Sequence, residues 1–254
     1  MIVSAHQAMY LPWLGYMDKL ARADLFVVVD HVQYEAQNFQ NRNRLKVNNG
    51  VSWVAVPLVH GPQEERLCDK RISNQSSPKE HWQRRTWQTI LTHYRRSPHF
   101  KAYSDELEDV YTRPWDNLVE LNLHVLQLLM RWFDIQRPVV RTSTLGCEGQ
   151  KTDMILNFCR RVGATTYLSG SGGSRDYLDV AKLEAAGIHV LWQQFQHPTY
   201  PQRYSGLGFL PRLSSLDLIL NCGQESRAIL FGETAAESLK PATENSAAAS
   251  GGTG

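Results

Sequence analysis

Polar side chains capable of catalysis stand directly after two short apolar runs near the start of the chain. His6 and Gln7 follow the first run, and Asp30 and Gln33 follow the second. An imidazole can act as a general base, and a carboxylate can orient or assist it. Simpler interpretations remain open, since His6 could cap the following helix and Asp30 could be a turn residue.

A high density of amide and guanidinium groups marks the segment QNFQNRNRLK, with Asn41, Arg42 and Asn43 at its centre. Guanidinium groups bind carboxylates or phosphates in a bidentate manner, and amides distinguish hydroxyls from carbonyls. We therefore expect these residues to recognise a substrate. A solvated turn is the alternative.

A third candidate is the glycine- and serine-rich stretch SGSGGSRD, which begins with Ser169, Gly170 and Ser171. Glycines allow backbone N–H groups to approach an anion closely, so this stretch could hold the phosphate of a donor. It matches neither the Walker motif nor the dinucleotide-binding fingerprint. A plain flexible loop is the alternative interpretation.

The residue types that bind metals do not fall into a ligand pattern. The four cysteines include no C-x-x-C pair, which argues against a zinc site and against a redox dithiol. His6, Asp30 and His31 have suitable side chains, but their spacing does not support a metal site. We predict none.

The elements that must position these groups indicate an α/β fold with a mostly parallel sheet flanked by helices. Apolar, β-branched runs predict the following strands: Ile2–Ala5, Leu25–Val29, Val139–Ser143, Thr165–Leu168 and Ile188–Gln193. Helices are predicted at Leu11–Ala23, from an N-cap at Thr152 to Gly163, at Asp176–Ala186, and over the late segment LDLIL. Ligands of such sheets bind beyond the carboxyl ends of the strands, where the candidate residues stand.

The middle of the chain has a different character. The turn Asn48-Asn49-Gly50 between Arg42–Val47 and Val51–Pro57 predicts a β-hairpin. A helical insertion is predicted at about residues 77–135, where Ser77, Pro78 and Glu80 form a capping box. Within it, residues 118–132 carry an apolar stripe at helical spacing.

The composition is that of an ordinary globular protein, with 42% apolar and 20% charged residues among 254. Basic residues are dispersed, whereas nucleic-acid binding requires a basic face, so we expect no nucleic-acid partner. The chain has neither a signal-peptide layout nor an apolar run long enough for a membrane span, and we predict a cytoplasmic protein. Residues 1–231 are expected to form one domain and residues 232–254 a disordered tail.

Several of these segments resemble the WbqC-like family. The opening HQAMYLPWLGY is similar to the family's H-Q-P-x-Y-L-P-W-L-G-Y, with Ala8 in place of the usual proline. The similarity continues through ADLFVVVDHVQY, QNRNRLK, YLSG and LSSLDLILNCG and covers about residues 1–231. The resemblance implies the following site residues: His6, Gln7, Tyr10, Trp13, Asp30, Gln33, Asn41, Arg42, Asn43 and Ser169.

The resemblance also implies a role in O-antigen or other surface-polysaccharide biosynthesis. We expect a transferase that moves an acyl or aminoacyl group, glycyl included, to an amine or hydroxyl of a sugar or similar small or carrier-bound metabolite. ATP and coenzyme A are the candidate cofactors. One alternative is an ATP-dependent ligase or nucleotidyltransferase, although Trp13-Leu14-Gly15-Tyr16 lacks the second histidine of the H-x-G-H element. Another is a non-catalytic ligand-binding protein of a pathway.

Overall fold

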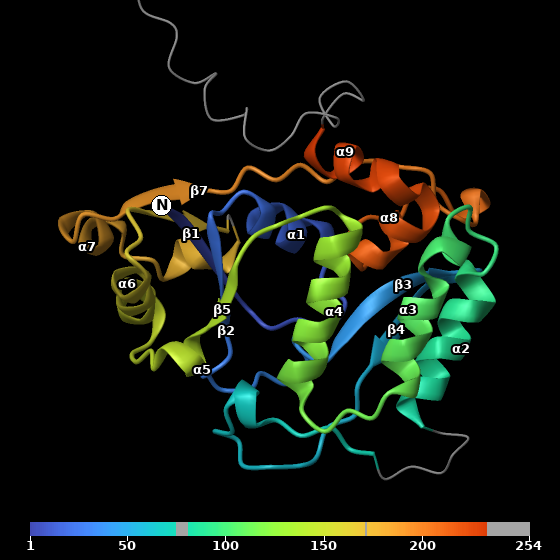
Figure 1. The fold of residues 1–254 in the computed structure, drawn as a ribbon, viewed down its shortest axis with the longest axis horizontal. Coiled ribbons are helices and arrows are strands. Elements are labelled where there is room, and N and C mark those ends of the chain that lie inside the picture. The colour runs from blue at the N-terminus through green and yellow to red at the C-terminus, as the bar shows by residue number, and fades with distance from the viewer. Residues whose placement is uncertain (75–80, 171, 233–254) are drawn as a thin grey trace, which may run out of the picture.

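A five-stranded parallel sheet forms the centre of the computed structural model, which describes residues 1–74, 81–170 and 172–232 (Figure 1). The strands lie in the order β5-β2-β1-β6-β7. Their bounds are Ile2–Gln7 for β1, Leu25–Val29 for β2, Val139–Arg141 for β5, Thr166–Ser169 for β6 and His189–Trp192 for β7. The predicted α/β class with a mostly parallel sheet is confirmed.

The sheet grows outward from β1 in both directions. After β1 the chain adds β2 and β5 on one side, and then β6 and β7 on the other. Val3 of β1 accordingly pairs with Leu25 of β2 and with Tyr167 of β6. Because the chain changes side here, the connections leaving β1 and β6 diverge and leave a crevice beyond the carboxyl ends of these strands.

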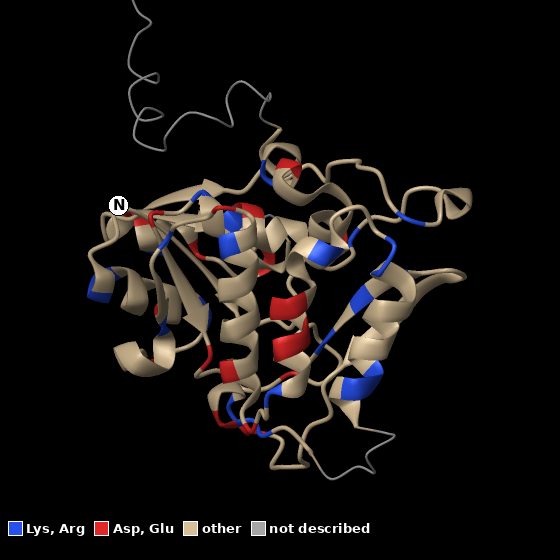
Figure 2. Cartoon of the chain, turned by 45° about the vertical axis from the view of Figure 1, so that its right-hand side comes forward, with Lys and Arg blue, Asp and Glu red and all other residues tan. Residues whose placement is uncertain are grey.

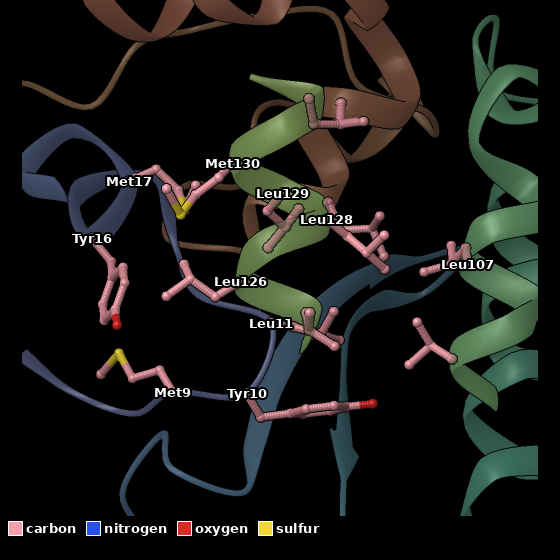
Figure 3. Packing of buried hydrophobic residues seen from close by; sticks show 14 of the residues in the cluster. Met9, Tyr10, Leu11, Tyr16, Met17, Leu107, Leu126, Leu128, Leu129 and Met130 are labelled. Atoms are coloured by element: carbon pink, nitrogen blue, oxygen red, sulfur yellow. The ribbon is translucent and has the colours of Figure 1, made fainter. Parts of the chain in front are cut away.

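Helices cover both faces of the sheet. On one face, α6 (Lys151–Val162) and α7 (Val180–Ala185) pack against apolar side chains of β1 and β2. On the other face lie α1 (Leu14–Ala21), α4 (Leu118–Trp132) and α8 (Ser215–Cys222). In Figure 3 the side chains of Leu126 and Met130 point from α4 toward Met17 of α1, so this contact joins α4 to the sheet layer.

The predicted hairpin and helical insertion are also present. Strands β3 (Arg42–Val47) and β4 (Gly50–Ala55) pair antiparallel around the expected turn. The insertion contains α2 (Trp82–Tyr94), α4 and a helix that the sequence analysis did not identify, α3 (Phe100–Thr112). In Figure 1, α4 lies between two parts of the molecule: the sheet is on one side, and the hairpin, α2 and α3 are on the other.

Shorter elements complete the described chain: η1 (Leu67–Asp69), α5 (Thr142–Leu145), η2 (Gly173–Asp176), η3 (Ser205–Leu207), η4 (Gly223–Glu225) and α9 (Ser226–Phe231). Lysine and arginine positions are spread over the sheet side and the hairpin side of the molecule in Figure 2. Across residues 1–74, 81–170 and 172–232, no helix has the length and apolar character needed to cross a membrane.

Two predicted helix starts are wrong. The cap of α6 is Gln150, and Thr152 lies inside that helix, where its hydroxyl donates to the carbonyl oxygen of Tyr177 at 3.2 Å. The helix predicted at Asp176–Ala186 is divided into η2 and α7. Asp179 separates them and caps α7 by accepting a hydrogen bond from the Lys182 amide at 3.0 Å.

Two other boundaries move inward. Helix α1 begins at Leu14 rather than Leu11, because Leu11 adopts a left-handed conformation with φ of 47°. The strand predicted to reach Ser143 ends at Arg141, since the chain turns there into α5. The capping box at Ser77, Pro78 and Glu80 and nearly all of the predicted tail lie outside the described residues.

Candidate functional site

A cavity of about 420 Å³ opens at the carboxyl ends of β1 and β6, where the chain changes side in the sheet. Its lining includes His6 and Gln7 of β1, Gly170 after β6, Gln193 after β7, Trp13 and Lys19 near α1, and Met154 of α6. This volume suits a metabolite-sized ligand. We call it the switch-point cavity.

An aromatic wall formed by Trp13 and Phe195 borders the cavity. The two rings meet edge to face with centroids 5.5 Å apart. The indole of Trp13 also lies over Gly15, where an added Cβ would be 2.3 Å from a ring carbon. Only glycine fits at position 15 while the indole keeps this place, which explains the W-L-G spacing physically.

The buried side chain of Asn43 holds the loop that leads to this wall. Its amide nitrogen donates to the carbonyl oxygens of Tyr10 at 3.1 Å and Leu11 at 2.7 Å. These bonds secure the left-handed backbone at Leu11. Asn43 therefore supports the cavity through the loop and is not among its lining residues.

His6 lines the cavity as a neutral imidazole. Its Nδ1 lies 3.2 Å from the carbonyl oxygen of Gln7, which can only accept. Nδ1 therefore carries the proton, and Nε2 keeps a lone pair. Burial, reinforced by the positive charge of Lys19, lowers the pKa of His6 to about 3.

Lys19 is a cavity residue that the sequence analysis missed. Its side chain belongs to α1, yet the residue is only 5% exposed. The Nζ atom donates to the carbonyl oxygen of Ala5 at 2.8 Å. Burial lowers the pKa of Lys19 to about 7, so its charge changes near neutral pH.

Gln193 is a second missed residue, and it fastens α1 to the end of β7. Its amide nitrogen donates to the carbonyl oxygen of Gly15 at 2.8 Å and to Oδ2 of Asp18 at 2.7 Å. Asp18 also accepts from Nε of Arg22 at 2.7 Å. The first turns of α1, and with them the aromatic wall, are thereby fixed relative to the sheet.

The model of the WbqC-like protein family matches residues 7–229. The chain belongs to this family. It is 30% identical over 227 residues to the uncharacterized protein Rv1507c of Mycobacterium tuberculosis (strain ATCC 25618 / H37Rv), an alignment that covers 88% of this chain and 95% of the relative. No solved structure matched the chain. Trp13, Lys19 and Gln193 all lie within the WbqC-like region, so it contains most of the cavity lining.

The second catalytic candidate of this WbqC-like protein, the carboxylate of Asp30, lies apart from the cavity lining. It is fully buried, and its oxygens accept hydrogen bonds from Arg141 Nε at 2.7 Å, Ser143 N at 2.8 Å, Ser143 Oγ at 2.7 Å and Thr142 Oγ1 at 3.1 Å. Within the described part of the chain, no hydrogen bond joins Asp30 to His6. The carboxylate stabilises the corner between β5 and α5.

The amide- and guanidinium-rich segment forms a surface of its own. The guanidinium of Arg42 lies over the ring of Trp53 at 4.7 Å and donates to the carbonyl oxygen of Gln37. The amide nitrogen of Asn41 donates to the Val56 carbonyl oxygen at 2.8 Å. The segment's contact with the cavity runs through Gln40, which donates to Gln7 Oε1 at 2.8 Å.

The remaining predicted site residues divide between the core, the surface and the cavity. Tyr10 is buried, with its hydroxyl 2.9 Å from that of Tyr111. Gln33 is exposed and donates to the Gln63 carbonyl oxygen at 2.7 Å. Ser169 is buried beside the cavity, Gly170 lines it, and Ser171 lies outside the described residues.

The structure thus brings together four of the predicted residues, His6, Gln7, Trp13 and Gly170, and adds Lys19 and Gln193 to them. In the described ranges, no three His, Cys, Asp or Glu side chains are grouped so that they could hold a metal ion. The arrangement can bind a small molecule, accept a hydrogen bond at His6 and place a positive charge beside the ligand.

Proposed function

We propose that this protein is a group-transfer enzyme that moves an acyl or aminoacyl group onto an amine or hydroxyl of a sugar or similar small metabolite. The observation that carries this proposal is the neutral His6 ring, with a lone pair on Nε2, in the switch-point cavity. A histidine in this state is suited to accept a hydrogen bond from the N–H or O–H of an acceptor.

In the proposed reaction the acceptor nitrogen or oxygen forms a bond to the acyl carbon. The bond from that carbon to the leaving group breaks, and the leaving group keeps the electron pair. The acceptor releases one proton, for which His6 Nε2 is the receiving atom. With a pKa of about 3, His6 by itself is a weak base, and negative charge on a bound donor would raise that pKa.

The apolar part of the cavity supports transfer rather than hydrolysis. Trp13, Phe195 and Phe158 contribute aromatic surface to the lining. Such surface would shield an acyl donor from water, which competes with the acceptor for the acyl carbon. The link between the WbqC-like family and surface polysaccharides favours a sugar as the acceptor.

An ATP-dependent ligase is the second candidate. It is favoured by Gly170, Gly172 and Gly173, which line the cavity directly after β6. Backbone free of side chains at this edge of a parallel sheet is the usual setting for a nucleotide phosphate. A ligase of this kind would release pyrophosphate as the carboxylate attacks the α-phosphate of ATP, and AMP as the acceptor displaces it from the acyl adenylate.

The full chain should be assayed against nucleotide-linked amino sugars, with acetyl-coenzyme A or with glycine and ATP as donors. Mass spectrometry would detect the acylated sugar, and a coupled assay would detect AMP and pyrophosphate.

The variant His6→Gln removes the proposed general base and should lower kcat by about 100-fold or more. The exposed His60 provides a control, and His60→Gln should retain full activity. Full activity in a folded His6→Gln would overturn the role of His6.

A further inference from the structure

Among the residues that the structure describes, the buried amine of Lys19 has no acidic partner. Its sequence neighbour Asp18 instead accepts hydrogen bonds from Arg22 and Gln193. The Nζ atom can donate three hydrogen bonds, and it donates one, to the Ala5 carbonyl oxygen. Burying an ammonium group without negative charge nearby destabilises a fold. Packing alone therefore does not explain why a lysine occupies position 19 in the cavity wall.

The surroundings of Lys19 make the cavity electropositive. Among the described residues that line it, none is an aspartate or a glutamate. The titratable groups that share the cavity are His6 of β1, Tyr16 of α1, Tyr167 of β6 and Tyr177 beyond η2. His6 is neutral, and burial raises the pKa of Tyr16 and Tyr167, so neither tyrosine ionises near neutral pH. When Lys19 is protonated, its charge is therefore uncompensated within this lining.

Beside Lys19 the cavity has room for ligand atoms. A Cβ added to Gly170 would lie 3.7 Å from the Lys19 Nζ, so the amine faces the start of the glycine-rich stretch. A Cβ added to Gly172 or Gly173 would meet nothing within 4 Å. The space along these glycines is open, and a ligand there could come within reach of the ammonium group.

We infer that Lys19 binds an oxyanion group of the substrate, a phosphoryl or carboxylate group, in the space beside Gly170. The inference relies on the proposed function only for the substrate's location in the switch-point cavity. It does not depend on acyl transfer being the reaction. An oxyanion supplies the charge that the lining lacks and can accept the remaining ammonium hydrogens.

Binding at this place is coupled to protonation. In the free protein the pKa of Lys19 is about 7, and a bound oxyanion would raise it. Below pH 7 the amine is already charged, so the Kd should become independent of pH. Above pH 7 each binding event takes up a proton, and the Kd should increase up to tenfold per pH unit.

Sulfate and acetate are suitable probes because neither titrates between pH 6 and 9. The full chain would carry 13C-labelled methionine methyl groups and be titrated at constant ionic strength. Met154 lines the cavity and reports binding, whereas Met130 of α4 lies in the hydrophobic core and serves as internal control. We expect saturable shifts of the Met154 signal, with a Kd that is flat near pH 6 and about tenfold higher at pH 9 than at pH 8. Tighter binding of sulfate indicates a phosphoryl ligand, and tighter binding of acetate a carboxylate.

Two variants test whether Lys19 is responsible for the binding of sulfate or acetate. Lys19→Met adds one methionine signal, and it should weaken sulfate or acetate binding at least 30-fold at pH 6 while the native methionine signals keep the dispersion of a folded protein. Lys182→Met removes an exposed lysine of α7 and should leave the Kd unchanged. A Kd that Lys19→Met does not alter, or that stays constant from pH 6 to 9, overturns the inference.

If Lys19 binds the anion but no donor supports transfer, the proposed function fails and the oxyanion site stands. If transfer is found and survives in Lys19→Met, the oxyanion site alone fails.

Discussion

The indole of Trp13 lies over the α-carbon of Gly15, closely enough that a Cβ at position 15 would be 2.3 Å from the ring. This contact makes the first turn of α1 part of the cavity wall. The same indole touches Phe195 beyond β7, which places segments about 180 residues apart in one aromatic contact. The W-L-G order of the motif is therefore a packing requirement of the switch-point cavity.

Gly15→Ala should displace the Trp13 ring. We expect the free energy of unfolding to fall by about 1–3 kcal/mol, because overpacking forces the partly buried indole out of its place. Urea unfolding and near-ultraviolet circular dichroism would measure the two effects. Gly206→Ala is the matched control, since a Cβ there would meet nothing within 4 Å. Equal stability of the two variants would contradict the packing role of Gly15.

Gln193→Leu should destabilise the same region by a different route. The substitution removes the hydrogen bonds to Gly15 and Asp18 and leaves a buried carboxylate oxygen unpaired. We expect a loss of about 2 kcal/mol in unfolding free energy. Gln88→Leu, at an exposed position of α2, should change the stability by less than about 0.5 kcal/mol. If both variants unfold alike, Gln193 does not fasten α1.

Much of the sheet could be predicted because its strands are apolar on both faces. Leu25–Val29 is a strand with the predicted bounds, and the candidate residues at the carboxyl ends of β1 and β6, among them His6, Gln7 and Gly170, do converge. Those two strand ends meet because β1 and β6 are neighbours, and apolar runs cannot specify that order. The α3 helix was missed because its sequence, FKAYSDELEDVYT, buries only four residues and has a polar majority.

The cavity chemistry was harder to predict than the strands. A lysine in an amphipathic helix is normally solvent-exposed, so its residue type alone does not indicate that Lys19 is buried. Its position between Met17 and Leu20, both fully buried, was the available signal. The environment of Asp30 could not be predicted from the sequence either. Its partner Arg141 is 111 residues away and becomes a neighbour only through the pairing of β2 with β5.

Asp30→Asn should unfold more readily without affecting His6. Removing the charge breaks the ion pair with Arg141 and should cost about 3 kcal/mol or more, since a buried pair loses one partner. Chemical denaturation would measure this cost, and Asp105→Asn at an exposed site is the control. The His6 ring signals in the NMR spectrum should not move, because the structure shows no contact between the two side chains. A shifted His6 signal would instead support the predicted catalytic pairing.

His6 should make the fold less stable as the pH falls. Its pKa in the folded chain is about 3, below the ordinary histidine value of 6.5, so the unfolded state binds more protons between these values. Relative to His6→Gln, the wild type should lose about 2 kcal/mol of unfolding free energy between pH 7 and pH 5. His60→Gln, at an exposed site, should show no such difference. If the unfolding free energies of the wild type and His6→Gln changed in parallel between pH 7 and pH 5, the imidazole would not be held neutral in the folded chain.

Lys19 should act in the same direction as His6 but over a higher pH range, because it too binds its proton less tightly in the folded chain than in the unfolded one. Its pKa falls from 10.5 to about 7 on folding, so the unfolded state binds more protons between these values and wild-type stability should increase with pH. Lys19→Met has no ammonium group to bury and should therefore be more stable than the wild type at pH 6. By pH 9 its advantage should shrink by about 2 kcal/mol, as measured by guanidinium unfolding. Lys182→Met should show no such change, because its side chain is half exposed. A constant difference between pH 6 and pH 9 would mean that the Lys19 ammonium is well solvated. The fold would then bear no cost in keeping a lysine at this position, and the main physical reason for an oxyanion partner would disappear.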